Sequence, residues 1–417
     1  MSDLVLKVLS GQTFRFAAVA VLVLVMLIPL AFVQGVSAER QRYFAQAAAD
    51  IAASWGGPQT VSGPFLVVPD ERDRVLLPST LDVSVDVRHQ MRTRGIYQVP
   101  VYQAVLKFSG TFVVPQSVGD RSVPARLVVG IGDTRAVAAV SNLELGGTEA
   151  RFAAGTGEGW LGEGVHAEAA LPKPGVSMPF AFELTLRGSQ TLGVAPVGSE
   201  TTIGMTSTWP HPSFTGRFLP DQHEIRADGF RARWAVHELA RGLPPSRLQA
   251  LATDYVSVSL FQPVTAYTRV DRGIKYGVLF IGLTFLTFVC FEIASAARFH
   301  YVQYAVVGAG LVLFYLALLS LSETLPFLWS YVIAALLLGS LVTWYVWRIT
   351  RRLALSLGVF AILAALYLCL YVLLALEAYA LLVGTGVLIV ALFALMHVTS
   401  RLDEPSPAGR AYPTTVP

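Results

Sequence analysis

Long apolar runs occupy both ends of this chain, whereas its middle alternates apolar and polar residues. Runs of roughly 18 or more apolar residues are typical of helices that cross a bilayer, because a helix satisfies its own backbone hydrogen bonds where lipid offers no partner. One run lies near the N-terminus and five follow the polar middle. We therefore expect six membrane-spanning helices, over residues 14–33, 276–294, 303–321, 327–347, 353–374 and 376–396.

The polar middle shows the pattern of a β-rich domain. Residues 36–55 favour helix and extend the first apolar run, and Gly56-Gly57-Pro58 ends that helix. Apolar and polar residues then alternate with period two, for example over 81–88 and 180–187, a pattern that buries one face of a strand and exposes the other. Asp228-Gly229, between two alternating segments, predicts a hairpin. Many strands with few helices favour an antiparallel, sandwich-like domain.

Two finer expectations concern the interior of this domain. A helix is expected near 244–253, and the long spacing leaves room for two β-subdomains with the glycine-rich stretch 146–164 as their seam. The whole chain is then expected to comprise a tip with the first membrane helix, the β-rich domain, a bundle of five helices and a tail. Their expected bounds are 1–35, 36–272, 273–398 and 399–417.

The charges of the short loops predict the orientation of the chain. Basic residues gather on the cytoplasmic side of membrane helices. After the β-rich domain, basic and acidic loops alternate without a break. Placing the basic loops inside puts both termini in the cytoplasm and residues 36–272 outside it. The basic loops carry Arg298, Arg348, Arg351, Arg352 and Arg401, and the acidic ones carry Glu323 and Glu377.

The first apolar run allows two interpretations. Val36-Ser37-Ala38 resembles the small-residue cleavage site of a signal peptide. Signal cores usually contain about 7–15 apolar residues, and this run is longer, which favours an uncleaved anchor. Both interpretations place the β-rich domain on the same side of the membrane.

Composition narrows the class of function. The hydrophobic fraction is 54% and the charged fraction 14%, against about 25% charged in typical soluble domains. A net charge of +3 over 417 residues is too small to indicate nucleic-acid binding. The two cysteines, Cys290 and Cys369, both lie in predicted membrane helices, so no disulfide is expected to support the exported domain.

The exported domain offers letter matches to catalytic motifs but not their context. Residues 157–162 match the dinucleotide fingerprint, yet more glycine and then prolines follow where a helix is required, so a flexible loop is the better interpretation. His211, His223 and His237 lack the close pairing of metal ligands. The sequence contains no Gly-x-Ser-x-Gly elbow. We therefore expect no catalytic residues, no cofactor and no metal.

A few acidic residues lie close to the predicted membrane helices. Glu292 falls near the inner end of its helix, and Glu323 and Glu377 fall near outer ends. Charge at membrane depth is unfavourable, so each acid is a candidate for a transport path. The alternative is that each side chain reaches the interface and plays no part in transport.

Several long segments are the most specific feature of the sequence. Residues 207–220 read Ser-Thr-Trp-Pro-His-Pro-Ser-Phe-Thr-Gly-Arg-Phe-Leu-Pro, and 262–281, 303–323 and 376–382 are equally distinctive. In these segments, and over essentially its whole length, the chain resembles the CreD family of bacterial inner-membrane proteins. It departs from the family pattern at Thr265, where that pattern has an acid, and any role of that acid is in doubt here.

The resemblance implies a periplasmic β-rich domain followed by a helical bundle in the inner membrane. It also implies membership of an envelope-stress regulon tied to a two-component system, with links to envelope integrity, colicin tolerance and the response to β-lactams. The family offers no catalytic residues to carry over.

Within the segment 207–220, which we call the signature segment, four ring side chains stand in a stiff Pro/Gly-rich context. Trp209, His211, Phe214 and Phe218 would offer aromatic surface to a partner or a cell-wall component. The alternative is that they pack the loop onto the sheet.

Three functions remain in competition. The leading hypothesis is a non-enzymatic inner-membrane protein that supports envelope integrity, whose periplasmic domain binds an envelope protein or cell-wall component while the helices anchor it in the lipid bilayer, alone or as a homo-oligomer. The second is a transporter or flippase of a lipid or small amphiphile. The third, an enzyme acting on the cell wall, would require a cleft with converging carboxylates or a serine–base pair.

Overall fold

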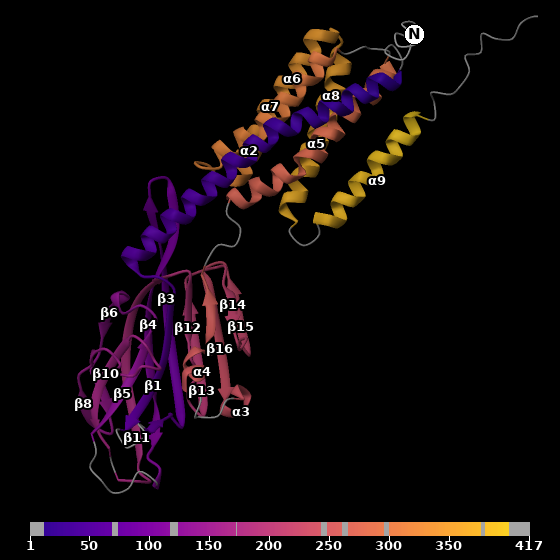
Figure 1. Ribbon diagram of the computed structural model, residues 1–417. Coiled ribbons are helices and arrows are strands. Elements are labelled where there is room, and N and C mark those ends of the chain that lie inside the picture. Colours follow the sequence, from indigo (N-terminus) through magenta and orange to yellow (C-terminus); the bar gives the residue numbers. More distant parts are fainter. Residues whose placement is uncertain are drawn as a thin grey trace, which may run out of the picture. The chain divides into compact units, whose positions relative to one another are not determined.

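The computed structural model describes residues 12–68, 74–116, 124–171, 173–242, 248–260, 266–295, 300–376 and 380–399. The chain forms two compact units (Figure 1). The helical unit comprises Met1–Arg42 and Val264–Pro417, and the β-domain comprises Tyr43–Pro263. The sequence places these limits near residues 36 and 272. They differ by a few residues because one helix runs through the first limit.

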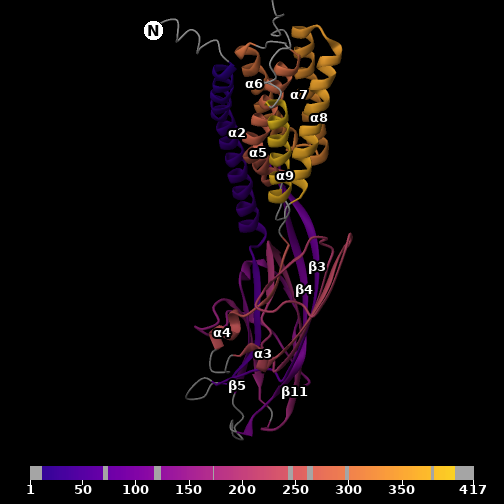
Figure 2. The ribbon, with the colours of Figure 1, turned by 90° about the vertical axis from the view of Figure 1, so that its right-hand side faces the viewer.

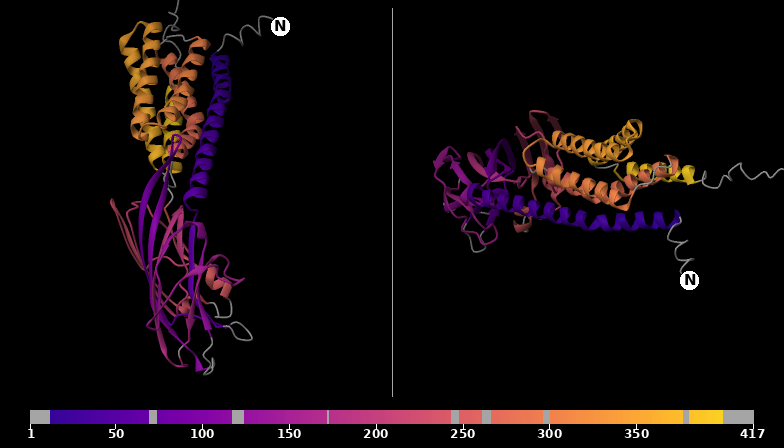
Figure 3. Two further views of the ribbon diagram at one scale, coloured as in Figure 1. Left: turned by 90° about the vertical axis from the view of Figure 1, so that its left-hand side faces the viewer. Right: turned by 90° about the horizontal axis from the view of Figure 1, so that it is seen from above.

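The helical unit contains the apolar helices that the sequence predicts, running alongside one another (Figures 2 and 3). Within the described residues, five helices are long and apolar enough to cross a membrane, one near the N-terminus and four in the C-terminal part. The last helix has a shorter apolar stretch, Leu382–Phe393, so its crossing of the membrane stays a prediction. The helices are α2 (Gln12–Trp55), α5 (Ala266–Ser295), α6 (Tyr301–Leu321), α7 (Phe327–Thr350), α8 (Leu353–Ala375) and α9 (Ala380–Thr399).

Glycine lets helices of this unit approach closely. A Cβ atom added at Gly308 of α6 would lie 2.8 Å from Met26 of α2 and 2.8 Å from Phe285 of α5. A Cβ atom at Gly277 of α5 would lie 3.0 Å from Leu30 of α2. Small residues at such crossings allow the backbone contact that drives helix association in lipid. The glycines thus bring α2, α5 and α6 together.

The β-domain is a sandwich of two sheets (Figure 1). The first sheet has the order β14-β17-β12-β1-β5-β10-β9, and β2 pairs with β1. Its strands are β1 (Gln59–Val68), β2 (Arg74–Leu76), β5 (Pro124–Ile131), β9 (Ala153–Ala154), β10 (Gly164–Ala170), β12 (Thr191–Val194), β14 (Ser213–Gly216) and β17 (Val256–Ser259).

The second sheet has the order β15-β16-β13-β3-β4-β11-β7-β8, and β6 pairs with β11. Its long strands run side by side (Figure 2). Its strands are β3 (Thr80–Arg94), β4 (Tyr97–Val113), β6 (Val137–Val140), β7 (Leu143–Leu145), β8 (Thr148–Ala150), β11 (Ser177–Ser189), β13 (Glu200–Ser207), β15 (Gln222–Arg226) and β16 (Gly229–His237).

The period-two pattern of the sequence becomes the core of the sandwich. Leu81, Val83, Val85 and Val87 on β3 are each 2% exposed or less, while the residues between them face outward. Residues from both sheets join one hydrophobic cluster, in which Trp234 is fully buried. Alternation therefore predicted the layers correctly, because burial of one strand face is what drives sheet stacking.

Two expectations about the interior of the domain need correction. The domain is one unit, not two subdomains, because residues 146–164 carry β8 of one sheet and β9 of the other and so connect the two layers. The sheets are not purely antiparallel either. β1 pairs with β12, and β13 with β3, in parallel, since strands so distant in sequence have connections long enough for a crossover.

Helices are short inside the β-domain. The helix expected near 244–253 is present as α4 (Leu248–Thr253), and α3 (Glu238–Arg241) follows β16. His237 begins α3, its Nδ1 accepting a hydrogen bond from the Leu239 amide. Gly56 ends α2 as expected, with a φ of +138° that side chains rarely adopt.

Candidate functional site

The signature segment runs from the end of β13 through β14, which is an edge strand of the first sheet. It packs against the hydrophobic core of the sandwich. Trp209 is only 3% exposed and belongs to the core. Its indole Nε1 donates to the backbone oxygen of His211 at 2.8 Å, and the ring of His89 meets it edge-on at 5.4 Å between centroids. Because its ring is buried and its polar atom is paired, Trp209 presents almost no surface to a partner.

The two phenylalanines of the segment pack in a similar way. Phe214, on β14, is half-buried, and its ring lies 5.7 Å from Phe230 and 5.9 Å from Trp234. The Trp234 indole Nε1 donates to the backbone oxygen of Phe218, which is also half-buried. Of the four rings predicted as a patch, only His211 is exposed. The packing alternative thus describes three of them.

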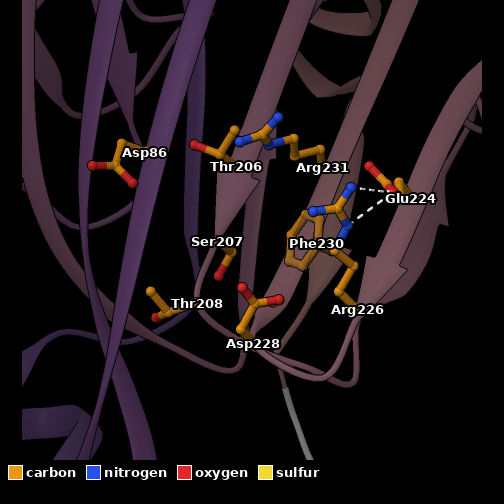
Figure 4. Close-up of a pocket in the computed structure, with 10 residues that line it drawn as sticks. Asp86, Thr206, Ser207, Thr208, Glu224, Arg226, Asp228, Phe230 and Arg231 are labelled. Atoms are coloured by element: carbon orange, nitrogen blue, oxygen red, sulfur yellow. Dashed lines mark hydrogen bonds and ion pairs between the residues drawn. The ribbon is translucent and has the colours of Figure 1, made fainter.

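A groove opens beside the start of the signature segment, on the outer face of the second sheet (Figure 4). Its volume is about 270 Å³. Four strands and one turn supply its walls: β3, β13, β15, β16 and the turn before β16. The lining residues are Asp86, Thr206, Ser207, Thr208, Glu224, Arg226, Asp228, Gly229, Phe230 and Arg231.

The groove carries charges of both signs at close range. Glu224 and Arg226, two residues apart on β15, form an ion pair with 2.6 Å between Oε1 and Nη2 (Figure 4). Asp86 on β3 is 3.4 Å from the guanidinium of Arg88. Arg231 faces the same space from β16. Such a surface suits a polar ligand that itself carries both charges.

The hairpin between β15 and β16 shapes the groove. Arg226 pairs with Gly229, so the predicted hairpin is present and its two-residue loop is Ala227-Asp228. This loop lies one residue before the Asp228-Gly229 pair that the motif would place there. Gly229 has a φ of +146°, and a Cβ atom there would lie 1.9 Å from the backbone oxygen of Ser207. Glycine is therefore required where the hairpin meets β13.

One hydroxyl–imidazole pair lies at the rim of the groove. Thr208 Oγ1 is 2.7 Å from His89 Nδ1 and also accepts from the His89 backbone amide at 3.2 Å. A hydroxyl nucleophile needs a base that is oriented by a third group. Among the described residues, nothing bonds to the second ring nitrogen of His89. The pair therefore ties the signature segment to β3 without forming a catalytic triad.

The other histidines and the fingerprint-like loop are also part of the scaffold. Residues 157–162 form turns between β9 and β10, and Glu158 there accepts from Arg126 at 2.8 Å. His223 lies on β15, with its ring 5.3 Å from that of Phe214. Within the part of the chain that the structure describes, no three His, Cys, Asp or Glu side chains gather as metal ligands would.

The predicted membrane acids do not form one site. Glu292 of α5 accepts a hydrogen bond from the Tyr304 hydroxyl at 3.2 Å, near the start of α6. Glu323 follows the end of α6 and pairs with Arg40 of α2 at 3.3 Å. The 21-residue α6, about 30 Å long, separates the two. Glu377 lies outside the described residues.

The sequence did not reveal the groove. Its charged residues come from segments up to 145 positions apart, between Asp86 and Arg231. In the sequence, each of them is an ordinary solvent-exposed position of a strand. The one available signal was the Asp228-Gly229 hairpin, which folds β15 back beside β16.

Together these features define an integral membrane protein in which a two-sheet β-domain is inserted between a first apolar helix and a C-terminal helical bundle. The family model for inner membrane protein CreD matches residues 12–404, and the chain belongs to this family. Inner membrane protein CreD of Escherichia coli (strain K12) is 32% identical over 412 residues, covering 91% of each chain. The chain is thus a multi-pass protein of the inner membrane, as the resemblance indicated.

Three solved structures show weak similarity to this chain. A Legionella pneumophila protein proposed to bind nutrients has a TM-score of 0.30 at 9% identity, covering 55% of this chain and 79% of its own. An M1 zinc metallopeptidase from Deinococcus radiodurans has a TM-score of 0.22 at 13% identity, covering 39% of each chain. Yeast LTA4 hydrolase has a TM-score of 0.22 at 9% identity, covering 50% and 35%. Scores this low support no argument about function.

Proposed function

We propose that this chain is a non-enzymatic inner-membrane protein that supports envelope integrity and the response to envelope stress, colicin tolerance included. The β-domain is the binding part and faces the periplasm, and the helices anchor it. The charged groove beside the signature segment carries this proposal, because it is a concave polar surface on the β-domain. The helices already account for attachment to the membrane, so the β-domain is left to bind a partner.

The alternating charges of the loops support the orientation. The turn between α7 and α8 carries Arg351 and Arg352, and the turn between α6 and α7 carries Glu323. With basic loops in the cytoplasm, both termini lie inside and the β-domain lies in the periplasm. Family membership adds the inner membrane as the membrane concerned.

The chemistry of the groove favours a zwitterionic ligand. Asp86, Glu224 and Asp228 bring negative charge, and Arg226 and Arg231 bring positive charge. Hydroxyl groups between them can donate to and accept from a peptide backbone or a sugar. A peptide-bearing cell-wall component or a polar segment of an envelope protein has this character. Among the described residues of the groove, no nucleophile is aligned with a base, which does not favour catalysis.

Transport by the bundle has less support. Glu323 has a cation beside it, and Glu292 accepts a hydrogen bond. Both contacts are those of side chains that join helices. An acid on a transport path would instead be expected to face a water-filled cavity.

Matched charge reversals test the proposal. In a deletion strain that is sensitive to envelope stress, full-length Asp86→Lys should fail to restore survival in detergent at normal protein level. Glu144→Lys is the control, because Glu144 is also an exposed acid on the second sheet but lies outside the groove. Equal rescue by both variants would overturn the proposal, and so would equal failure, since then the position of the charge is irrelevant.

A further inference from the structure

A second concave surface lies in the helical unit, between α7 and α8. Its volume is about 340 Å³. Of the residues that line it, Tyr331, Leu363 and Tyr367 are buried, whereas Leu336, Ala364 and Leu368 are exposed. We call it the α7–α8 groove. Leu336 and Leu368 are 57% and 64% exposed, so the groove faces the medium that surrounds the bundle.

The length of the groove matches one leaflet. It runs from Leu328, at the start of α7, to Gly339, a rise of about 16 Å at 1.5 Å per residue. The hydrocarbon core of a bilayer is about 30 Å thick, so each leaflet contributes about half of that. The groove therefore begins at the end of the bundle that carries Glu323 and ends near the middle of the helices.

Two tyrosines form a buried part of the lining of this apolar groove. Tyr331 and Tyr367 are 3% and 4% exposed, and the Tyr331 hydroxyl donates to the backbone oxygen of Tyr367 at 2.6 Å. This bond joins α7 to α8, so the groove offers a ligand a fixed and almost entirely apolar surface.

The guanidinium group of Arg269 lies near the end of the groove that begins at Leu328. Arg269 of α5 lies over the ring of Phe327, 5.4 Å from its centroid. The Phe327 ring is 6.1 Å from that of Tyr331, which lines the groove. Arg269 is half-buried and has no ion pair among the described residues. A guanidinium in this position is suited to two parallel hydrogen bonds with a phosphate.

From this arrangement we infer that the α7–α8 groove binds an anionic phospholipid of the surrounding bilayer. The phosphate pairs with Arg269, and an acyl chain lies along Ala335 and Gly339. Charge complementarity selects the headgroup, since basic sites between membrane helices favour anionic lipids. This inference does not rest on the role proposed for the β-domain.

The test is native mass spectrometry of the full-length protein in detergent, with phosphatidylglycerol or phosphatidylcholine added. The wild type should retain one phosphatidylglycerol at least fivefold more often than phosphatidylcholine. Ala364→Trp fills the groove and should abolish retention. Ala365→Trp is its matched control, because Ala365 is exposed on the same helix but does not line the groove, and it should retain lipid as the wild type does.

A second pair of variants tests the headgroup contact. Arg269→Gln should lower the preference for phosphatidylglycerol to less than twofold, whereas Arg348→Gln, in the last turn of α7, should leave it unchanged. Ala364→Leu fills part of the groove and replaces Ala364→Trp should the latter not fold. Equal retention of both lipids by the wild type, or equal retention by Ala364→Trp and Ala365→Trp, overturns the inference. A dimer mass that Ala364→Trp abolishes also overturns it, because a second copy would then cover the groove.

Discussion

Arg40 of α2 and Glu323, just beyond α6, form an ion pair with 3.3 Å between Nε and Oε1. Beside it, Gln41 donates to the backbone oxygen of Tyr267 at 3.4 Å. These contacts join the N-terminal helix to the C-terminal bundle within the helical unit. The Glu323 side chain is only 18% exposed, so its charge is stabilised by a partner of the protein itself.

Removing the Glu323 charge should weaken this attachment without removing function. The partner Arg40 is 41% exposed, and solvent screens such pairs, so the coupling between the two residues should be below about 1 kcal/mol. Thermal unfolding of Glu323→Gln, Arg40→Gln and the double variant measures it. All three should rescue the deletion strain. Loss of rescue in Glu323→Gln at normal protein level would instead favour a transport path.

Gly229 should be indispensable to the groove of the β-domain. Gly229→Ala places a Cβ atom against the Ser207 backbone oxygen in a conformation that side chains rarely adopt, which should reduce stability by at least about 2 kcal/mol. Gly204→Ala, on the neighbouring β13, is the control because nothing lies within 4 Å of its Cβ position. Chemical denaturation of the two variants compares them, and equal stability would contradict the geometry.

Tyr102 should make the β-domain sensitive to alkali. It is 1% exposed and donates to the backbone oxygen of Thr191 at 2.7 Å, and burial raises its pKa above the ordinary value. Because the pKa is raised in the folded state, the protonated Tyr102 hydroxyl stabilises that state fully at pH values below the unfolded-state pKa of about 10. This stabilisation is lost as pH rises beyond that value.

Replacing Tyr102 separates its titration from that of the other tyrosines. Tyr102→Phe removes one hydrogen bond and should be less stable than the wild type by about 1 kcal/mol at pH 7. The difference should shrink between pH 10 and pH 12 as the wild type loses stability. Denaturation curves across this range measure it, and a difference independent of pH would show that the hydroxyl does not titrate on unfolding.

Much of the fold could be predicted because burial leaves a periodic trace in the sequence. The strand alternation at Leu81–Val87 and the hairpin at Asp228-Gly229 both follow from local rules. The parallel pairing of β13 with β3 left no such trace, because the choice of a partner strand that is distant in the sequence is not recorded in either strand's local pattern. The same limit explains the predicted division into two subdomains.

The candidate site was harder to predict than the fold. Residue type indicated Trp209, Phe214 and Phe218 as parts of a binding patch. An aromatic residue in a loop can, however, equally well pack into a core or form a binding surface. Only the structure shows that Trp209 is buried. The groove residues Asp86 and Arg231 are ordinary outward positions in their strands, and their proximity depends on sheet order.

His89 should matter for stability more than for chemistry. Its ring contacts Trp209 and bonds to Thr208, so His89→Ala should lower the free energy of unfolding by about 1 kcal/mol. Envelope function should persist in His89→Ala at matched protein level. If His89→Ala abolished rescue while remaining as stable as the wild type, the imidazole would have a catalytic role.

The most direct measurement blocks the groove from outside the cell. In a Cys290→Ser, Cys369→Ser background, Thr208→Cys or the control Glu144→Cys would be treated with a charged, membrane-impermeant maleimide, and labelling and survival under detergent stress would be followed together. The account predicts that both cysteines are labelled in intact cells and that only the label on Thr208→Cys sensitises them. Labelling that occurs only after lysis would contradict the periplasmic position, and full labelling of Thr208→Cys with unchanged survival would contradict the role of the groove.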